Sequence, residues 1–493
     1  MPDSQATGSG DDNPLSNADL APVLPASRTW GMGNFIALWI SLAACIPTYL
    51  LASSLVDQQV GMNWSQAIFT IFLANVIVLI PMVLNAHAGT KYGIPFPVYC
   101  RASFGTLGAN IPAILRALVA CGWFGIQAWI GGMAISQILG RFFPALLASP
   151  PIAALGISLP QAACFLFFWG INMGVISKGI DCIRGLLLIK APLLIVLGLA
   201  LLWWAYDKAG GFGAMLSQPS QFSPGQPKAG QFWVVFFPAL TGMIGFWATL
   251  SLNIPDFSRY AKSQRDQVIG QAIGLPPTMA LYSFIGVAVT SATAVIYGET
   301  IWDPTILLTK FSNPIVLVIA MLALSIATLA TNIAANVVSP ANDFSNLAPH
   351  KISFRTGGYI TGVVGILMMP WKLLADPDVY IFTLLGGFSA LLGPIGGILI
   401  ADYFVCRRKE LDPVALYQSH GAYRFTGGFS LVAIAALVLG VLPSLPGFLV
   451  QVKLAGPGVF PLCLVALYHY AWFVGFGLAF FLYIVLRKLA PRA

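Results

Sequence analysis

Long apolar stretches alternate with short polar segments along most of the chain, and twelve of these stretches are candidates for membrane helices. A helix needs about 20 apolar residues to cross ~30 Å of hydrocarbon. The stretches centre on residues 35–55, 66–86, 107–139, 161–177, 185–205, 232–254, 272–297, 313–337, 357–371, 379–405, 427–448 and 463–486. The pattern predicts an all-α polytopic membrane protein: twelve transmembrane helices within residues 35–486, between a solvated tail at 1–34 and a short tail at 487–493.

The basic residues predict which side of the membrane each segment occupies. An even number of spans puts both termini on one side, and most of the 25 Lys and Arg residues fall in segments on that side. Cytoplasmic loops of membrane proteins carry an excess of Lys and Arg. We therefore expect a multi-pass protein of the cell (plasma or inner) membrane with both termini in the cytoplasm.

Composition excludes several other classes of protein. Hydrophobic residues make up 58% of the chain and charged residues 9%, whereas an average soluble domain is about 25% charged. A long soluble enzyme is therefore excluded. A transmembrane β-barrel would show alternating strands rather than solid apolar stretches. The net charge of +8 is spread over short polar gaps and forms no basic stripe, so we expect no nucleic-acid partner.

Two of the predicted helices contain helix-breaking residues. The first carries Pro47 at mid-span, which removes a backbone hydrogen bond and frees carbonyls near residues 43–44. Either neighbouring groups repair a simple kink, or the helix unwinds and the carbonyls face a site. The sixth helix carries Pro238, Gly242 and Gly245 just before Trp247.

The positions of these breaks suggest an internal symmetry. Breaks in helices one and six are the arrangement expected of a five-plus-five inverted repeat, with the substrate site between them. The repeats would cover about 35–205 and 232–405, and 427–486 would hold two extra helices. Two unrelated kinks in glycine-rich helices remain the alternative.

Polar residues within two other predicted helices are candidates for a binding site. Trp123 and Gln127 are four residues apart, and so are Asn332 and Asn336, so each pair shares a helical face. A tryptophan face beside an amide suits a flat heterocycle with ring N–H and C=O groups. The same pattern is also typical of helix packing, with the amide bonded to a neighbouring carbonyl. Thr331 could lend a hydroxyl to a cation held by carbonyls of the first helix.

Residues for other chemistries are absent from the sequence or lie in unsuitable positions. The acidic residues nearest to membrane depth are Asp181, Asp256, Asp343 and Asp402, and none stands clearly at mid-span. A carboxylate proton relay has no obvious occupant, although Asp256 or Asp343 could act near the inner mouth. The chain has no H-E-x-x-H, Walker A or nucleophile-elbow motif. We therefore expect neither an enzyme nor a cofactor.

Several segments resemble the nucleobase:cation symporter-1 family, which includes purine-cytosine and allantoin-uracil-hydantoin permeases. The resembling segments are residues 17–22, 28–30, 89–97, 101–105, 115–117, 122–127, 253–259, 331–336, 339–341, 370–372 and 401–403. The resemblance spans about residues 17–490 and is specific in combination. It implies twelve spans, the five-plus-five inverted repeat and cation-coupled uptake by alternating access.

The resemblance also implies roles for individual residues. The two aromatic faces that sandwich the substrate fall on Trp123 and Trp247, and the hydrogen-bonding amides fall on Gln127 and Asn336. Cys45 stands where related permeases tend to carry a polar amide near the substrate.

A sodium site falls, by the same resemblance, on carbonyls and hydroxyls of the first and eighth helices. Its positions are Ser41, Ala44, Ala327, Ala330 and Thr331. Ala330 lacks the hydroxyl expected there, which removes one side-chain oxygen and leaves proton coupling as an alternative to sodium coupling.

The sequence as a whole therefore predicts a secondary active symporter for a planar nitrogen heterocycle. Candidate substrates are uracil and other nucleobases, allantoin or a hydantoin, imported with sodium or protons from one side of the lipid bilayer to the other. The alternatives are a passive channel for small polar solutes, or a family permease for another ring compound such as cytosine, a purine or a vitamin.

Overall fold

The computed structural model describes residues 14–178 and 180–490, without the side chains of residues 180–192, so both predicted tails are only partly covered. The first half contains α1 (Met32–Ala43), α2 (Ile46–Val56), α3 (Trp64–Tyr92), α4 (Phe96–Phe104), α5 (Asn110–Phe142), α6 (Pro144–Leu147), α7 (Leu159–Lys178), α8 (Ile180–Ala209), α9 (Phe212–Met215), α10 (Phe232–Phe246) and α11 (Ala248–Asn253).

The second half continues in the same way. It contains α12 (Pro255–Ser258), α13 (Gln264–Tyr297), α14 (Pro304–Thr309), α15 (Pro314–Asn336), α16 (Val338–Leu347), α17 (Phe354–Leu367), α18 (Pro370–Leu373), a π-helical turn (Val379–Leu385), α19 (Gly386–Ile400), a second π-helical turn (Ala401–Cys406), α20 (Leu431–Val441), α21 (Leu445–Gln451), α22 (Leu462–Leu467) and α23 (Ala471–Leu489). Short 3₁₀ turns lie at Pro25–Ser27, Ala415–Tyr417, Leu442–Ser444 and Tyr468–Tyr470.

The all-α prediction is confirmed over the described residues, where the only strand-like pairings are isolated bridges. A helix lies in each of the twelve predicted stretches. Within the described part of the chain, eight helices are long and apolar enough to cross a membrane, and the bent pair α1 and α2 makes a ninth span. The count of twelve spans stays a prediction.

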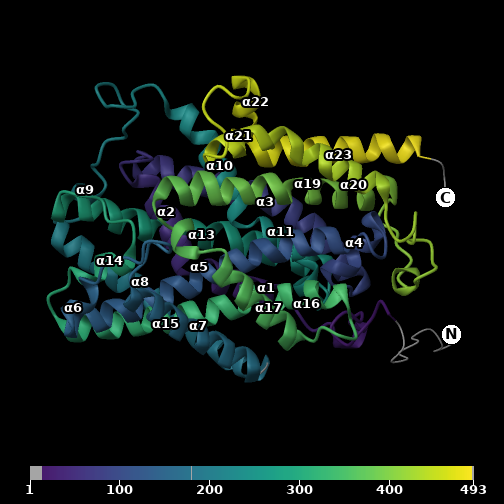
Figure 1. The fold of residues 1–493 in the computed structure, drawn as a ribbon, viewed down its shortest axis with the longest axis horizontal. Coiled ribbons are helices and arrows are strands. Elements are labelled where there is room, and N and C mark those ends of the chain that lie inside the picture. Colours follow the sequence, from purple (N-terminus) through teal and green to yellow (C-terminus); the bar gives the residue numbers. More distant parts are fainter. Residues whose placement is uncertain (1–13, 179, 491–493) are drawn as a thin grey trace.

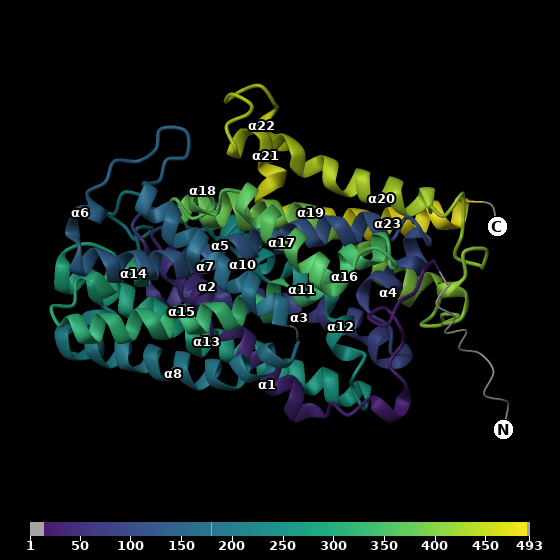
Figure 2. The same ribbon diagram turned by 60° about the horizontal axis from the view of Figure 1, so that its bottom comes forward.

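The helices form an elongated bundle with its two chain ends at the same end (Figure 1). The last helix, α23, packs with α19 and α20 along one side, and α7, α8 and α15 lie on the other. The turned view keeps the N-terminal coil, α4 and the end of α23 together at one end (Figure 2), and α6 and α14 at the opposite end. This arrangement agrees with the even number of crossings expected from the sequence.

Helix one is broken as the sequence allows. The chain leaves the helix at Ala44 and Cys45, and α2 begins with a bend of 58° relative to α1. Helix six is interrupted nearer to its C-terminal end than its proline suggests. Pro238 lies inside α10, and the interruption falls at Trp247, between α10 and α11.

Two leucines anchor the described part of the N-terminal tail to the helices, while its other residues remain at least partly exposed to solvent. Leu20 is fully buried. The Arg101 guanidinium donates to the Leu15 carbonyl at 2.8 Å, and the Tyr417 hydroxyl donates to the Leu20 carbonyl at 2.7 Å. Backbone bonds tie Trp30 to the segment after α12.

Candidate functional site

The two helix interruptions border a small cavity of about 30 Å³. Four elements line it: the break between α1 and α2, the middle of α5, the junction of α10 and α11, and the end of α15. The lining residues are Leu42, Cys45, Pro47, Trp123, Gln127, Phe246, Trp247, Thr249, Leu250, Thr331, Ala335 and Asn336. The five residues predicted to bind substrate are therefore brought together around one cavity.

Proline chemistry explains the break that forms one wall. Pro47 has no N–H to give to the Ala43 carbonyl, its partner in a continuous helix. The next amide, of Thr48, donates to the Cys45 carbonyl at 3.1 Å instead of to Ala44. The carbonyls of Ala43 and Ala44 thus lose their helical donors. Of the two alternatives that the sequence left open, a repaired kink or an unwound helix, the structure has the unwound helix. Freed carbonyls inside a membrane protein need another polar partner.

Aromatic rings make up much of the cavity wall. The Phe246 ring lies edge-on to Trp123, with centroids 5.1 Å apart, and edge-on to Trp247 at 4.9 Å. Behind Trp247, Trp39 packs edge-on at 5.2 Å. These perpendicular contacts hold both tryptophan rings in place.

Two polar atoms at the cavity have no hydrogen-bond partner among the described residues. They are Gln127 Oε1 and Trp247 Nε1, both buried. Buried polar groups in folded proteins are nearly always paired, so an acceptor and a donor left free at one cavity indicate a place for a polar ligand. The packing alternative required Gln127 to bond a neighbouring carbonyl, and no such bond is present within the described residues.

A chain of amides sets the orientation of Asn336. Asn172 of α7 accepts from the Asn332 amide at 3.1 Å, and Asn332 in turn accepts from the Asn336 amide at 3.1 Å. The Asn332 amide also contacts the Phe124 carbonyl of α5. Because the Asn336 nitrogen is used in this chain, its oxygen is the atom left to accept a hydrogen bond from a ligand.

The residues implied in a sodium site lie on two helices that pack together. Ala44 and Ala327 are buried in the same core, and α1 contacts α15. The Thr331 hydroxyl donates to the Ala327 carbonyl at 2.9 Å. Ser41, at the other end of the set, is partly exposed on α1. Ala330 offers no side-chain oxygen, so the oxygens available here are backbone carbonyls and the Thr331 hydroxyl.

The residues predicted to bind substrate are buried from solvent. Trp123, Gln127, Trp247, Asn336 and Cys45 are each at most 5% exposed. On the side of α2, the Tyr380 hydroxyl donates to the Pro47 carbonyl at 3.2 Å, and its ring lies 6.4 Å from Trp123. A substrate can therefore enter only if these helices move.

Sequence patterns missed several residues of this site. Phe246, Trp39, Tyr380 and Asn172 were not singled out, and only Phe246 had a local signal, because it adjoins Trp247. Tyr380 sits in the π-helical turn before α19, a distortion that often marks functional sites. Its contact with Pro47 joins residues 333 positions apart, which no local pattern reveals.

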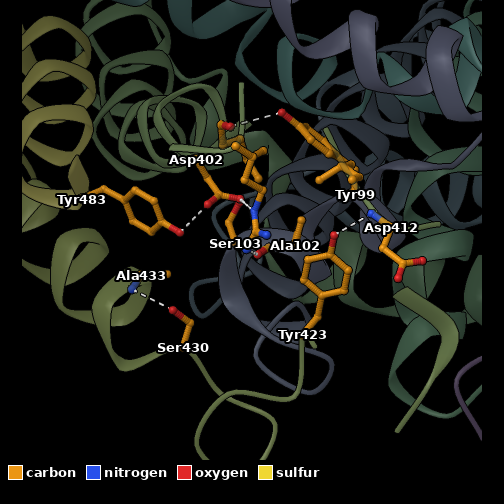
Figure 3. Close-up of polar contacts among 12 residues, drawn as sticks. Tyr99, Ala102, Ser103, Asp402, Asp412, Tyr423, Ser430, Ala433 and Tyr483 are labelled. Atoms are coloured by element: carbon orange, nitrogen blue, oxygen red, sulfur yellow. Dashed lines mark hydrogen bonds and ion pairs between the residues drawn. The ribbon is translucent and has the colours of Figure 1, made fainter. Parts of the chain in front are cut away.

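The acidic residue Asp402 belongs to a structural cluster away from this cavity (Figure 3). Tyr483 donates to one of its carboxylate oxygens at 2.8 Å, and Ser103 donates to the other at 3.1 Å. The Arg407 guanidinium adds an ion pair at 2.7 Å. With both oxygens paired, Asp402 ties the second π-helical turn to α4 and α23.

Comparison with known proteins identifies the family. Residues 22–475 match the family described as permeases for cytosine/purines, uracil, thiamine and allantoin. The chain belongs to this family. It is 46% identical to the purine-uracil permease NCS1 of Arabidopsis thaliana over 98% of this chain and 79% of that protein. It is 41% identical to the allantoin permease of Bacillus subtilis over 98% of this chain and 95% of that one.

Solved structures of another member confirm the fold of this permease. Mhp1, a nucleobase-cation-symport-1 family transporter, in a closed conformation with bromovinylhydantoin bound, superposes with a TM-score of 0.76 at 25% identity, covering 96% of each chain. Its inward-facing conformation gives a TM-score of 0.77 at 26% identity, covering 98% of this chain and 96% of that one. The permease is thus a membrane-embedded secondary transporter with the predicted transporter fold, not an enzyme.

Proposed function

We propose that this permease is a symporter that imports a planar nitrogen heterocycle, of the uracil, allantoin or hydantoin type, together with a cation. The observation that carries the proposal is the buried cavity at the two helix interruptions. There, two tryptophans, two amides and an unpaired indole N–H lie around one small cavity.

The chemistry of the cavity matches such a ring. Trp123 and Trp247 offer π-faces, on which flat heterocycles stack. Gln127 Oε1 and the Asn336 oxygen would accept ring N–H groups, and Trp247 Nε1 would donate to a ring carbonyl. Cys45 contributes a thiol that already contacts the Thr48 hydroxyl at 3.2 Å, a weaker partner than an amide.

The relatives support this class of substrate but differ among themselves. Their names cover purines and uracil, allantoin, uridine and hydantoin. We favour uracil and allantoin, since the two relatives above carry those names at over 40% identity. The second choice within the family is cytosine, a purine or a vitamin.

The coupling ion and the orientation are the finer parts of the proposal. The Thr331 hydroxyl and the carbonyls of Ser41, Ala44 and Ala327 would give a sodium ion few ligands, because Ala330 contributes none. We therefore favour proton-coupled or weakly sodium-dependent uptake. The excess of Lys and Arg on the side of the termini supports a cytoplasmic position for both termini.

A counterflow assay tests the substrate class. The purified permease, reconstituted in vesicles, is loaded with unlabelled uracil, cytosine, a purine, allantoin or benzylhydantoin, and uptake of a labelled member of the panel is followed. We expect counterflow with at least one flat heterocycle, and competition among rings that share its N–H and C=O pattern. Counterflow with none of the panel, by protein that is folded and inserted, would refute the proposal.

A further inference from the structure

Four aspartates are buried in the described part of the chain, and they differ in how completely their oxygens are paired. Asp57 accepts from the Gln59 amide and the Thr300 hydroxyl. Asp402 is paired through both oxygens, as described above. The four buried aspartates are Asp57, Asp256, Asp343 and Asp402.

Asp256 is also fully paired. One oxygen accepts the Phe96 amide at 2.8 Å, and the other accepts the Ser339 hydroxyl. Phe96 begins α4, and Asp256 lies in the first turn of α12. Each oxygen of Asp256 therefore has a hydrogen-bond donor beside it.

Asp343 has a different environment. Arg116 of α5 pairs with one of its oxygens, and both side chains are at most 1% exposed. The other oxygen, Oδ1, is buried and has no hydrogen-bond partner among the described residues. Asp343 also lies in the C-terminal half of α16, where the helix dipole disfavours a negative charge.

Arg116 pairs with Asp343, and Asn253 and Ser339 lie between Arg116 and Asp256. The Asn253 side-chain oxygen accepts from Arg116 Nη1 at 3.2 Å, and the Ser339 hydroxyl lies beside both Asn253 and Asp256. With both aspartates ionised, the buried network carries one uncompensated negative charge. A buried charge without a partner is costly and tends to be neutralised, and one proton on Asp343 would balance the network.

Two helices connect this network to the substrate cavity. Asn336, Ser339 and Asp343 follow one another at spacings of three and four, so they lie along one face of α15 and α16. On α11, the Asn253 amide nitrogen donates to the carbonyl of Thr249, a cavity residue, at 2.6 Å. Events at the cavity and at Asp343 are therefore mechanically joined.

We propose that Asp343 is the proton-binding carboxyl that couples substrate import to proton entry, a step that rests on the function proposed above. The carboxylate takes up one proton by way of the substrate cavity when the cavity opens outward. It releases that proton to the cytoplasm when α12 and α16 separate, the Ser339–Asp256 bond breaks and water reaches Asp343. Each cycle then moves one proton inward with one heterocycle, and Arg116 pairs with the regenerated carboxylate.

Other ionisable groups surround Asp343. They are Arg116 and the Cys121 thiol of α5, Asp256 of α12, and Cys100 of α4, beside which Arg101 binds Asn346. None of these offers an unpaired buried carboxylate oxygen. Asp343 is thus the site at which a proton changes the charge balance most directly.

An imposed pH gradient tests the coupling. In vesicles at fixed sodium, the wild-type permease should show a several-fold higher initial rate of uptake when the outside is acidic, with a substrate that gives counterflow. Asp343→Asn should lower the ratio of the rates with and without the gradient to about one. The matched control is Asp207→Asn, an exposed carboxylate at the end of α8, which should keep the wild-type ratio.

The possible outcomes distinguish a failure of the proton site at Asp343 from a failure of the proposed transport function. Counterflow moves no net proton, so it reports whether a variant still carries substrate. Counterflow by the wild type without any response to the pH gradient, or a full response in Asp343→Asn, overturns the proton site and leaves the transport function standing. If Asp343→Asn gives no counterflow, Asp343→Glu decides: a displaced pH dependence supports the site, and an unchanged one overturns it. Absence of counterflow in the wild type refutes the transport function itself.

Discussion

Individual side chains at the cavity have two different roles in the proposed binding of substrate. Trp123 and Trp247 present ring surface, whereas Gln127 and Asn336 present hydrogen-bonding atoms whose direction is set by neighbours such as Asn332. Loss of ring surface should weaken binding of every flat substrate alike. Loss of an amide should affect most those substrates that place an N–H or C=O opposite it.

Removal of either tryptophan ring should therefore lower affinity. Trp123→Ala and Trp247→Ala each remove a stacking face worth ~1–3 kcal/mol, so we expect the substrate concentration for half-maximal uptake to rise roughly tenfold or more. Concentration-dependent uptake measures this. The control is Trp233→Ala, whose ring is 61% exposed on α10 and should change uptake little. Equal affinities in all four proteins would mean that the rings only pack.

The amides should separate into contact and positioning roles. Gln127→Ala and Asn336→Ala leave ligand groups unpaired, at about 1–3 kcal/mol each. Asn332→Ala frees the Asn336 amide to rotate, and should raise the half-saturating concentration less than Asn336→Ala does. Competition between uracil and allantoin measures the three effects. A larger loss in Asn332→Ala than in Asn336→Ala would contradict this order.

The coupling ion can be probed at one residue. Ala330→Ser restores a hydroxyl beside Thr331 and should increase the stimulation of uptake by sodium, because the site gains an oxygen ligand. Initial rates with sodium replaced by choline give the measure. A wild-type permease that already depends steeply on millimolar sodium would show that the missing hydroxyl is not limiting.

The placing of two residues at one site was predictable where they are close in sequence and lie on the same face of one helix. The spacing of Trp123 and Gln127 survives in the structure because both lie in the uninterrupted helix α5. Tyr380 and Asn172 could not be predicted, since their contacts depend on how distant helices pack.

At the scale of the elements, the break between α1 and α2 coincides with a proline, whereas the break between α10 and α11 does not. The break at Ala44–Cys45 follows directly from the missing N–H of Pro47 and was predictable. Pro238 has the same defect, but it is the seventh residue of α10 and the helix continues past it to Phe246. Just before the interruption at Trp247, Gly245 packs closely against Leu385 of the π-helical turn and Ser389 of α19.

Close helix approach through glycine should be required for stability. A Cβ at Gly125 of α5 would lie 2.4 Å from the Gly365 carbonyl oxygen of α17. Gly125→Ala should therefore destabilise the permease, by about 1–3 kcal/mol on the scale of overpacked cores. Thermal unfolding in detergent measures the effect. Gly174→Ala on α7, where nothing lies within 4 Å, is the control, and an equal loss in both variants would contradict the packing argument.

At the scale of the whole molecule, the buried site of this permease can be compared with Mhp1, whose structures show a closed and an inward-facing conformation. A site whose residues are at most 5% exposed can exchange substrate only through conformations that open it to one side at a time. The presence of long apolar helices was predictable from the sequence because the bilayer dictates their length and composition. The docking of the N-terminal segment was not, since its bonds go to Arg101 of α4 and Tyr417 of a 3₁₀ turn, both distant in sequence.

The most direct test of the account is accumulation against a gradient. Energised vesicles containing the permease are given a labelled heterocycle that supports counterflow, with and without an uncoupler. The account predicts an internal concentration well above the external one, which falls to equality when the uncoupler is added. Equilibration only to the external concentration in energised vesicles, unaffected by the uncoupler or by sodium, would identify a passive pathway and contradict the account.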